Sequence, residues 1–235
     1  MKIKGSVKTT LFVAWSVASF FSCTVAKADE FTERMNTVYM FGDYGLGTYK
    51  SLLVASNDTM GVVTYGLGVT AGSEKNISVE YRTEKQTVNF AINESSLTSA
   101  WTSTIFKYRI WAFEFGPVIG SVKMKSERES SEIFDIVGDG YGGYFGILIP
   151  VSRSDLAYLN VMSVSTATPV DTKERTVTLG PRLDIELGGK IALTRKALNF
   201  TVGYRQRTHS ITEGGTSYNE RQTATFLGFQ LGKDF

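Results

Sequence analysis

Beyond residue 28, the chain consists of short segments in which apolar and polar residues alternate. In Met60–Ala71, the odd positions from 63 to 69 are large and apolar, and the even positions between them are Thr or Gly. Alternation with period two places the apolar side chains on one face of a β-strand. No long stretch shows the 3.6-residue period of a helix, and no apolar run reaches the ~18 residues of a transmembrane helix. The sequence therefore predicts an all-β fold.

The first 28 residues have the three parts of a secretory signal peptide. A positive start, an apolar middle and small residues before the cleavage point are present: Lys2, Lys4 and Lys8, then Leu11–Phe21, then Ala26 and Ala28. We expect cleavage before Asp29, which makes residues 1–28 the signal peptide and residues 29–235 the mature domain. Cleavage before Cys23, as in lipoproteins, is the alternative.

The composition of the mature chain excludes several classes of site. Removing the signal peptide takes away four lysines and no acid, so the formal net charge falls from +2 to −2, and we expect no nucleic-acid binding. Cys23 is the only cysteine, so the mature chain has no thiol ligand or disulfide. Gly138–Gly143 matches G-x-G-x-x-G, but no helical pattern follows, and a glycine-rich strand entry is the better interpretation. We expect no cofactor and no metal site.

Ten alternating segments follow one another along the mature chain. We predict strands over Thr37–Leu46, Met60–Ala71, Asn76–Ala91, Ala100–Tyr108, Trp111–Lys125, Gly140–Ile149, Leu156–Ala167, Arg175–Leu193, Leu198–Thr208 and Arg221–Phe235. The fourth and fifth segments are separated only if the chain turns at Arg109–Ile110, because the aromatic residues change parity there. Without that turn the number of strands falls to eight.

The connections between these segments are expected to differ in length. Those after odd-numbered strands are long, such as the charged stretch Ser126–Asp139 and the glycine-bearing stretch Ser210–Glu220, whereas those after even-numbered strands are short. This asymmetry is typical of outer-membrane barrels, in which periplasmic turns are short and outer loops are long. Both chain ends are then expected in the periplasm.

The C-terminal segment carries a resemblance to a known class of protein. Apolar residues recur with period two up to the last residue: Leu227, Phe229, Leu231 and Phe235. An alternating strand that ends on an aromatic residue, behind a signal peptide, resembles the insertion signal of bacterial outer-membrane β-barrels, in which Phe229, Leu231 and Phe235 supply the apolar positions. Lys233 departs from that pattern, because these proteins usually carry an apolar residue there.

This resemblance implies an up-and-down antiparallel transmembrane β-barrel in the outer membrane of a Gram-negative cell. It also implies contact with membrane lipid and lipopolysaccharide, help from periplasmic chaperones and the barrel-assembly machinery during biogenesis, and a monomeric state. The expected role is structural or interaction-based. A narrow porin-like channel for small solutes is the alternative.

In a membrane barrel, one face of each strand meets lipid and the other faces the lumen. The apolar, lipid-facing candidates are Val63, Tyr65, Leu67, Ile77, Val79, Tyr81, Phe106, Tyr108, Phe113, Phe115, Ile119, Phe200, Val202, Tyr204, Leu227, Phe229 and Leu231. The opposite faces carry five acids and five bases: Glu80, Glu84, Glu114, Asp184 and Glu186, and Arg82, Lys107, Arg182, Arg205 and Arg207. Because unpaired charges in a narrow lumen are costly, we expect these residues to form an ion-pair network that plugs the barrel. A charge-selective pore is the alternative interpretation.

Two outward-facing lysines are candidates for contact with lipopolysaccharide phosphates. Lys123 and Lys125 lie about 30 Å beyond Trp111 along the membrane normal if the strand rises ~3.3 Å per residue with a tilt of about 40°. Trp111 is then expected in the inner aromatic girdle, and the two lysines at the outer rim.

We expect the protein not to be an enzyme. His209, at the predicted outer end of a strand, is followed directly by Ser210, so the two side chains point to opposite faces and lack the spacing of lipid A deacylases. Asp139 and Asp171 are possible rim acids of an omptin-like protease, without a supporting motif. A soluble lipocalin-like carrier is the remaining class, and its apolar face would point inward.

Overall fold

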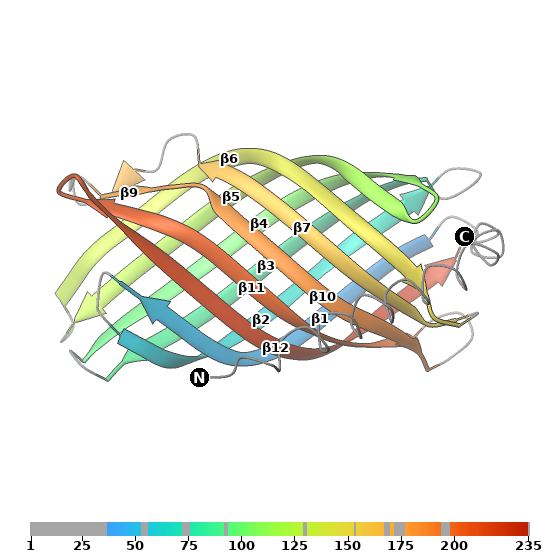
Figure 1. Ribbon diagram of the computed structural model, residues 1–235, viewed down its shortest axis with the longest axis horizontal. Coiled ribbons are helices and arrows are strands. Elements are labelled where there is room, and N and C mark those ends of the chain that lie inside the picture. Colours follow the sequence, from blue (N-terminus) through green and yellow to red (C-terminus); the bar gives the residue numbers. More distant parts are fainter. Residues whose placement is uncertain are drawn as a thin grey trace, which may run out of the picture.

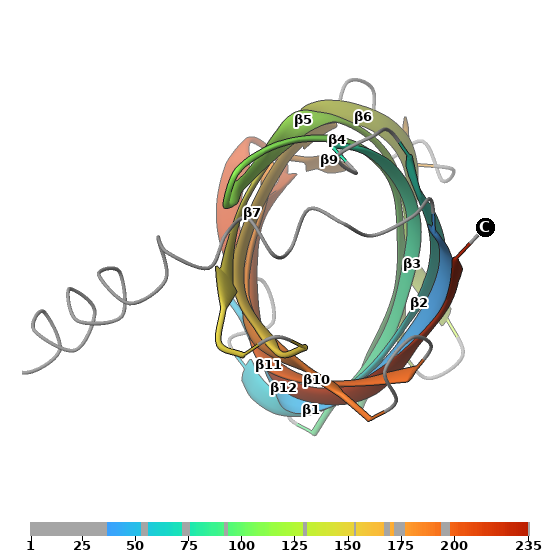
Figure 2. The same cartoon turned by 90° about the vertical axis from the view of Figure 1, so that its right-hand side faces the viewer.

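The computed structural model shows a closed barrel of long, tilted β-strands (Figures 1 and 2). It describes residues 37–52, 56–71, 76–91, 94–128, 131–152, 154–166, 170–171, 177–193 and 198–234. The predicted signal peptide and the terminal Phe235 lie outside the described residues. Within the described ranges, the structure contains no helix that is long and apolar enough to cross a membrane.

Ten long antiparallel strands make the barrel wall, which confirms the predicted fold and strand number. The strands are β1 (Thr37–Ser51), β2 (Ser56–Ala71), β3 (Ile77–Phe90), β4 (Ser95–Ile110), β5 (Phe113–Arg128), β6 (Ser131–Pro150), β7 (Leu156–Thr166), β9 (Val177–Leu179) with β10 (Arg182–Ala192), β11 (Leu198–Glu213) and β12 (Thr216–Asp234). Each strand pairs with its neighbour in the chain, and β12 pairs with β1 to close the cylinder.

The eighth strand is interrupted. Both β9 and β10 pair with β11, and the break between them falls at Gly180–Pro181. Proline cannot donate to a ladder, which explains why the strand is interrupted at this point. The two-residue β8 (Val170–Asp171) pairs with β6 beside the break.

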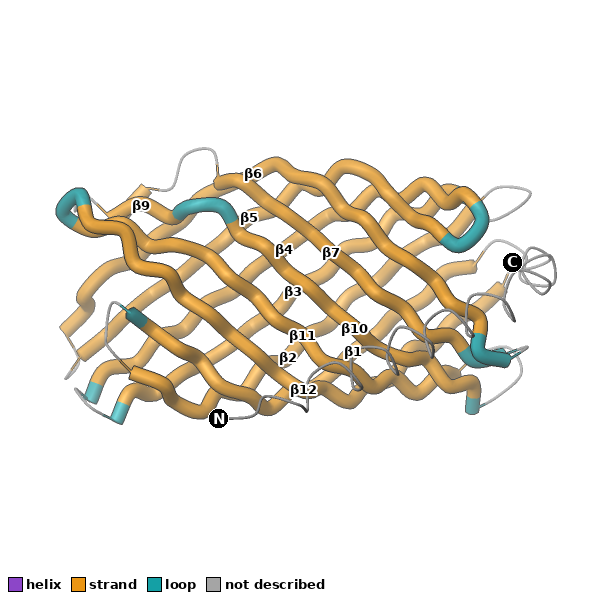
Figure 3. Tube along the Cα trace, viewed as in Figure 1, coloured by secondary structure: helices purple, strands orange, loops and turns teal. Residues whose placement is uncertain are grey.

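The strands are longer than predicted at the end of the barrel away from Thr37 and Asp234, the first and last described residues (Figure 3). The expected loop over residues 126–139 is wrong, because β5 continues to Arg128 and β6 already begins at Ser131. The expected loop over residues 210–220 is also wrong. There, β11 and β12 meet across Gly214 and Gly215, whose φ angles of 56° and 84° suit a two-residue hairpin turn.

The turn between β4 and β5 lies at Trp111–Ala112, two residues after the predicted position. Trp111 has a φ of 55° and is 84% exposed, so it belongs to the turn and not to the start of a strand. The next turn along this rim is fixed by Asp155, which accepts hydrogen bonds from the Ala192 backbone N–H (3.1 Å) and the Ser152 hydroxyl (2.9 Å). These bonds lower the pKa of the Asp155 carboxyl.

The G-x-G-x-x-G run lies within strand β6 and not in a phosphate-binding loop. At Gly142, a Cβ atom would lie 1.7 Å from the carbonyl oxygen of Ser163 on β7. The glycine therefore permits close approach of two wall strands.

The half of the barrel that contains Thr37 and Asp234, the first and last described residues, is apolar on the outside. Its exposed side chains, here called the apolar belt, include Val38, Met40, Tyr44, Leu46, Val63, Tyr65, Leu67, Val69, Ile77, Val79, Tyr81, Phe106, Tyr108, Phe113, Phe115, Ile119, Phe145, Leu187, Ile191, Tyr204, Leu227, Phe229 and Leu231. Of the predicted lipid-facing residues, only Phe200 and Val202 are half-buried instead of exposed. On β1, the eight steps from Val38 to Leu46 cover roughly 20 Å of the barrel axis at ~3.3 Å per residue and a tilt of about 40°.

The other half, here called the distal half, has the opposite polarity. Its outward positions are mostly polar, with Val137 as an exposed apolar exception, and include Thr48, Lys50, Asn57, Thr59, Lys85, Thr87, Thr98, Ser121, Lys123, Asp139 and Arg221. Its inward side chains form a buried cluster, here called the apolar plug: Tyr49, Met60, Val62, Val88, Phe90, Leu97, Trp101, Val122, Met124, Phe134, Ile136, Leu179, Ile211 and Ala224. The apolar interior expected of a soluble carrier is therefore concentrated in this half, where Gln86, Glu220 and Gln222 are also buried. A second, smaller buried apolar cluster lies elsewhere in the barrel: Ile105, Val118, Tyr144, Met162 and Val164.

Candidate functional site

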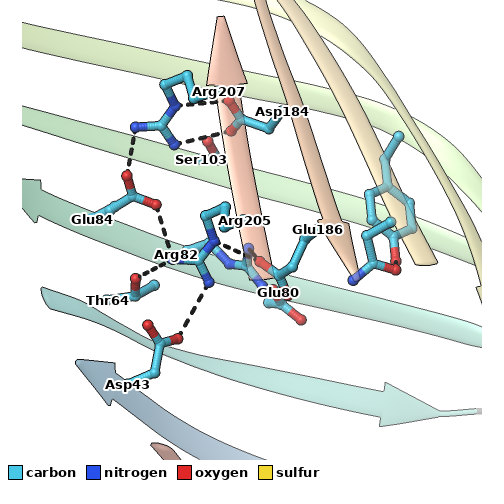
Figure 4. Close-up of polar contacts among 12 residues, drawn as sticks. Asp43, Thr64, Glu80, Arg82, Glu84, Ser103, Asp184, Glu186, Arg205 and Arg207 are labelled. Atoms are coloured by element: carbon cyan, nitrogen blue, oxygen red, sulfur yellow. Dashed lines mark hydrogen bonds and ion pairs between the residues drawn. The ribbon is translucent and has the colours of Figure 1, made fainter. Parts of the chain in front are cut away.

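The lumen between the two halves is crossed by charged side chains, and Arg205 on β11 is at their centre (Figure 4). Its guanidinium donates to Glu186 on β10 (2.7 Å), to Glu84 on β3 (3.2 Å) and to the Thr64 hydroxyl on β2 (2.7 Å). A longer contact of 3.4 Å reaches Asp43 on β1. Arg205, Glu84 and Glu186 are buried and the Asp43 side chain is only 8% exposed, so one guanidinium ties together strands from opposite sides of the wall.

Arg207 extends the same network one step further along β11. It forms two hydrogen bonds with Asp184 on β10 (2.7 and 3.0 Å) and a third with Glu84. Arg182 also donates to Asp184, at 2.9 Å, and reaches the Ser103 hydroxyl on β4 at 3.4 Å. Since Glu84 is shared by Arg205 and Arg207, all these groups form a single network.

A second group of ion pairs lies nearer the chain ends. Glu80 accepts from Lys107 (2.7 Å) and from the Tyr39 hydroxyl (3.0 Å), and it lies 3.3 Å from Arg82. Arg82 in turn contacts Glu186 at 3.0 Å, which joins this group to Arg205. At the rim, Glu114 pairs with Arg109 and accepts from Tyr144.

The structure brings all ten predicted lumen residues into one inward-facing set. Eight are buried, and Arg82 and Lys107 are half-buried. Sequence reasoning missed Asp43 and Arg109. The parity of Tyr44 and Leu46 on the same strand places Asp43 inward, whereas Arg109 had been assigned to a turn.

A cavity of about 60 Å³ lies among the ion pairs on the side of the chain termini. It is lined by polar groups, including Tyr39, Glu80, Lys107, Glu114 and Lys190. Polar cavities of this size accommodate a few water molecules.

The apolar plug lies directly against the other side of the network. Its Trp101 ring is covered by the guanidinium groups of Arg182 and Arg207, whose carbon atoms are 4.8 and 5.1 Å from the ring centroid. His209 packs on the same ring, with 5.5 Å between centroids, and Tyr49 packs in turn on His209, with 6.5 Å between centroids. The interior of the barrel therefore contains two layers of side chains in series, one ionic and one apolar.

The expected position of His209 at the outer rim is wrong. Its side chain is 3% exposed inside the lumen, because β11 continues to Glu213 and the inward alternation continues with it. Asp139 points outward from β6, and the side chain of Asp171 lies outside the described residues. The structure does not bring His209, Ser210 and Asp139 to one face of the wall.

Replacing His209 with phenylalanine tests this assignment. Neither ring nitrogen has a hydrogen-bond partner in the described part of the chain, so we expect the variant to be as stable as the native protein or more stable by about 1 kcal/mol. The measurement is the urea midpoint of refolded barrel in detergent, with Ser210→Ala on the outward face as the control. A loss of more than about 2 kcal/mol would show that the imidazole has a polar partner.

The other predicted site residues lie on the outside. Phe229 and Leu231 belong to the apolar belt. Lys123 points outward from β5 in the distal half, and Lys125 forms an ion pair with Glu127. Within the described residues, no group of three or more His, Cys, Asp or Glu side chains is arranged to hold a metal ion.

The fold and the surface together define a class of protein: an antiparallel β-barrel with an apolar belt around the half that contains its chain ends. No protein-family model matches the chain, and no curated protein sequence matches it.

Solved structures with a similar arrangement are barrels of outer-membrane proteins. They include the translocator domain of the autotransporter NalP from Neisseria meningitidis (TM-score 0.45, 13% identity, 93% of this chain and 96% of that chain). Neisserial surface protein A has a TM-score of 0.40 at 14% identity, over 83% and 96% of the two chains. The outer membrane protease OmpT from Escherichia coli has a TM-score of 0.41 at 8% identity, over 86% and 97%. These similarities are too low to assign a role.

Proposed function

We propose that the chain is a monomeric outer-membrane β-barrel with a sealed lumen and a structural or surface-interaction role. The observation that carries this proposal is the pair of barriers in the lumen. Arg205 contacts carboxylates from three strands, and the apolar plug fills the space beyond it. A charged solute entering from either end meets paired charges or apolar side chains, and both oppose its passage.

The membrane position is supported by the apolar belt. In hydrocarbon, every backbone N–H and C=O group needs a hydrogen-bond partner. A closed barrel supplies these partners because every strand is paired on both sides. The estimated belt height on β1, roughly 20 Å, is close to the ~25 Å apolar band of outer-membrane barrels. In this orientation the chain ends lie in the periplasm and the distal half lies outside the cell.

The distal half supports a role at the cell surface. Its strands extend beyond the apolar belt as paired hairpins, and its outer face carries hydroxyl, amide and charged side chains. An apolar interior holds this extension together in the manner of a water-soluble barrel. This arrangement favours recognition of a partner by the rigid outer face of the distal half.

We also propose that the chain is not an enzyme. His209, the only histidine of the sequence, is enclosed in the lumen, whereas Asp139 faces outward. A general base needs hydrogen-bond contact with its reacting group, and the barrel wall prevents that contact for a substrate at the rim.

Conductance measurements test the sealed lumen. We expect native protein, refolded and inserted in planar bilayers, to show no steady single-channel steps. A Trp101→Ala variant should also be silent, because the ionic barrier remains intact beneath the shortened plug.

Detergent without protein is the baseline for this experiment, and insertion is checked by protease protection. Steady steps from native protein would contradict the sealed lumen and favour a narrow channel. Steps from the Trp101→Ala variant alone would show that the apolar plug is the only effective barrier.

A further inference from the structure

Two cations lie directly opposite each other on the outer face of the distal half. Lys50 on β1 and Arg221 on β12 are register partners, and both side chains are exposed. Like charges in directly opposed positions of a sheet are destabilising. The outward positions that flank the pair in register are Asn57 on β2 and Thr208 on β11, neither of which is acidic. Within the described chain, these flanking positions therefore supply no carboxylate that could offset the repulsion.

The pair lies at the height expected for lipid headgroups. Lys50 follows Leu46, the last apolar-belt residue of β1, by four positions, which is roughly 10 Å along the axis. Between Leu46 and Lys50 on β1, the hydroxyl of Thr48 forms a hydrogen bond of 3.0 Å with the hydroxyl of Thr223 on β12. The Arg221 guanidinium donates to the Gln206 side chain at 2.8 Å, which orients it.

Two further outward cations lie on strands of the same wall, Lys85 on β3 and Lys123 on β5. Lys85 on β3 has its ammonium 5.9 Å from the ring centroid of Tyr65 in the apolar belt. Lys85 and Lys123 are joined in register through Ala100 on β4. Outward acids among the described residues of the distal half, such as Asp139, lie on β5 and β6. The strands from β12 to β3 therefore present a positive surface.

We propose that Lys50 and Arg221 bind a phosphate group of an outer-leaflet glycolipid, as in the lipid A part of lipopolysaccharide. Ammonium and guanidinium groups are strong donors to phosphate oxygens. The surrounding hydroxyl and amide side chains of Thr48, Thr223 and Asn57 suit the sugar hydroxyls that flank such a phosphate. This inference rests on the proposed membrane position, and it adds a pair of residues to the predicted contacts at Lys123 and Lys125.

The test uses the full-length mature barrel, refolded in detergent, with diphosphoryl lipid A as the probe. Native mass spectrometry measures the apparent dissociation constant for native protein and for the Lys50→Gln/Arg221→Gln variant. We expect the variant to bind about 30-fold more weakly, since two cations that each contact the anionic headgroup are lost. Lipid A without phosphates should bind native protein no more tightly than it binds the variant.

A matched control removes two exposed cations elsewhere. The Arg128→Gln/Lys233→Gln variant has the same change in charge, at the distal hairpin and at the chain-end rim, and it should keep native affinity. Unchanged affinity in the Lys50/Arg221 variant, or equal loss in the control, would overturn the assignment. Equal affinity of native protein for phosphatidylglycerol would overturn the choice of a glycolipid.

A second measurement separates binding from structure. Without lipid A, the Lys50→Gln/Arg221→Gln variant should unfold at the same urea concentration as native protein or a higher one, because a like-charge contact is removed. A lower midpoint would show a structural role and contradict the proposal. Only protein that has passed the gel-shift assay for folded barrels is used, so loss of this site is distinct from failure to insert into a membrane.

Discussion

Replacing Arg205 with methionine is expected to lower the free energy of unfolding by about 3–5 kcal/mol, the usual cost of removing one partner from a buried ion-pair network. The substitution leaves the buried carboxylates of Glu186, Glu84 and Asp43 without the guanidinium that they share. Reversible urea unfolding in detergent micelles or lipid vesicles measures the change.

The control for this variant is Arg221→Met on the neighbouring strand β12. It makes the same chemical change at an exposed arginine, and it should cost less than about 1 kcal/mol. If Arg205→Met does not refold, Arg205→Lys keeps the charge but loses the forked contacts, and a smaller loss is then expected. Native-like stability of Arg205→Met would mean that water solvates these carboxylates, and the sealed lumen would be untenable.

The second large effect is expected on the outside of the barrel. Arginine in place of Leu67, which is 55% exposed in the apolar belt of β2, should cost about 2–4 kcal/mol in a bilayer, because its charge meets hydrocarbon. Arginine in place of Thr59, on the same strand and the same face but in the distal half, should cost almost nothing.

These two variants locate the membrane on the barrel wall. Unfolding is followed in vesicles and again in detergent, where the penalty at Leu67 should decrease because a micelle deforms around the charge. Equal costs at Leu67 and Thr59 in vesicles would place the apolar belt outside the hydrocarbon and contradict the proposed orientation.

Alternation in the sequence was sufficient to predict the faces of the strands near the chain ends. The predicted apolar residues of β3 and β12 lie outside and the predicted lumen charges of β3 and β10 lie inside, because hydrocarbon imposes a strong rule on every second residue. The distal ends of the strands were missed because that rule does not act on their polar outward face. In residues 126–139, the outward face meets water, so charged side chains in a strand resemble those of a loop.

The site could be predicted only in part. Parity on single strands identified the inward charges, but the partners of Arg205 come from strands that are not neighbours, such as β1 and β3. No local pattern specifies a contact across a lumen, and the register of all ten strands is needed to find it. The Lys50–Arg221 pair could not be predicted either, because the first strand was expected to end at Leu46, before Lys50. His209 was predicted at the rim because its strand was expected to end at Thr208. The strand continues to Glu213, and the His209 side chain is buried in the interior.

The contacts of Arg205 with Asp43 and Glu84 also have a consequence for assembly. They join residues that are 162 and 121 positions apart in the chain. Such distant contacts are reached late in folding, because the intervening chain must first be ordered. In this barrel they require the first and last strands to lie near each other, so the ion pairs of Arg205 with Asp43 and Glu84 form only as the cylinder closes.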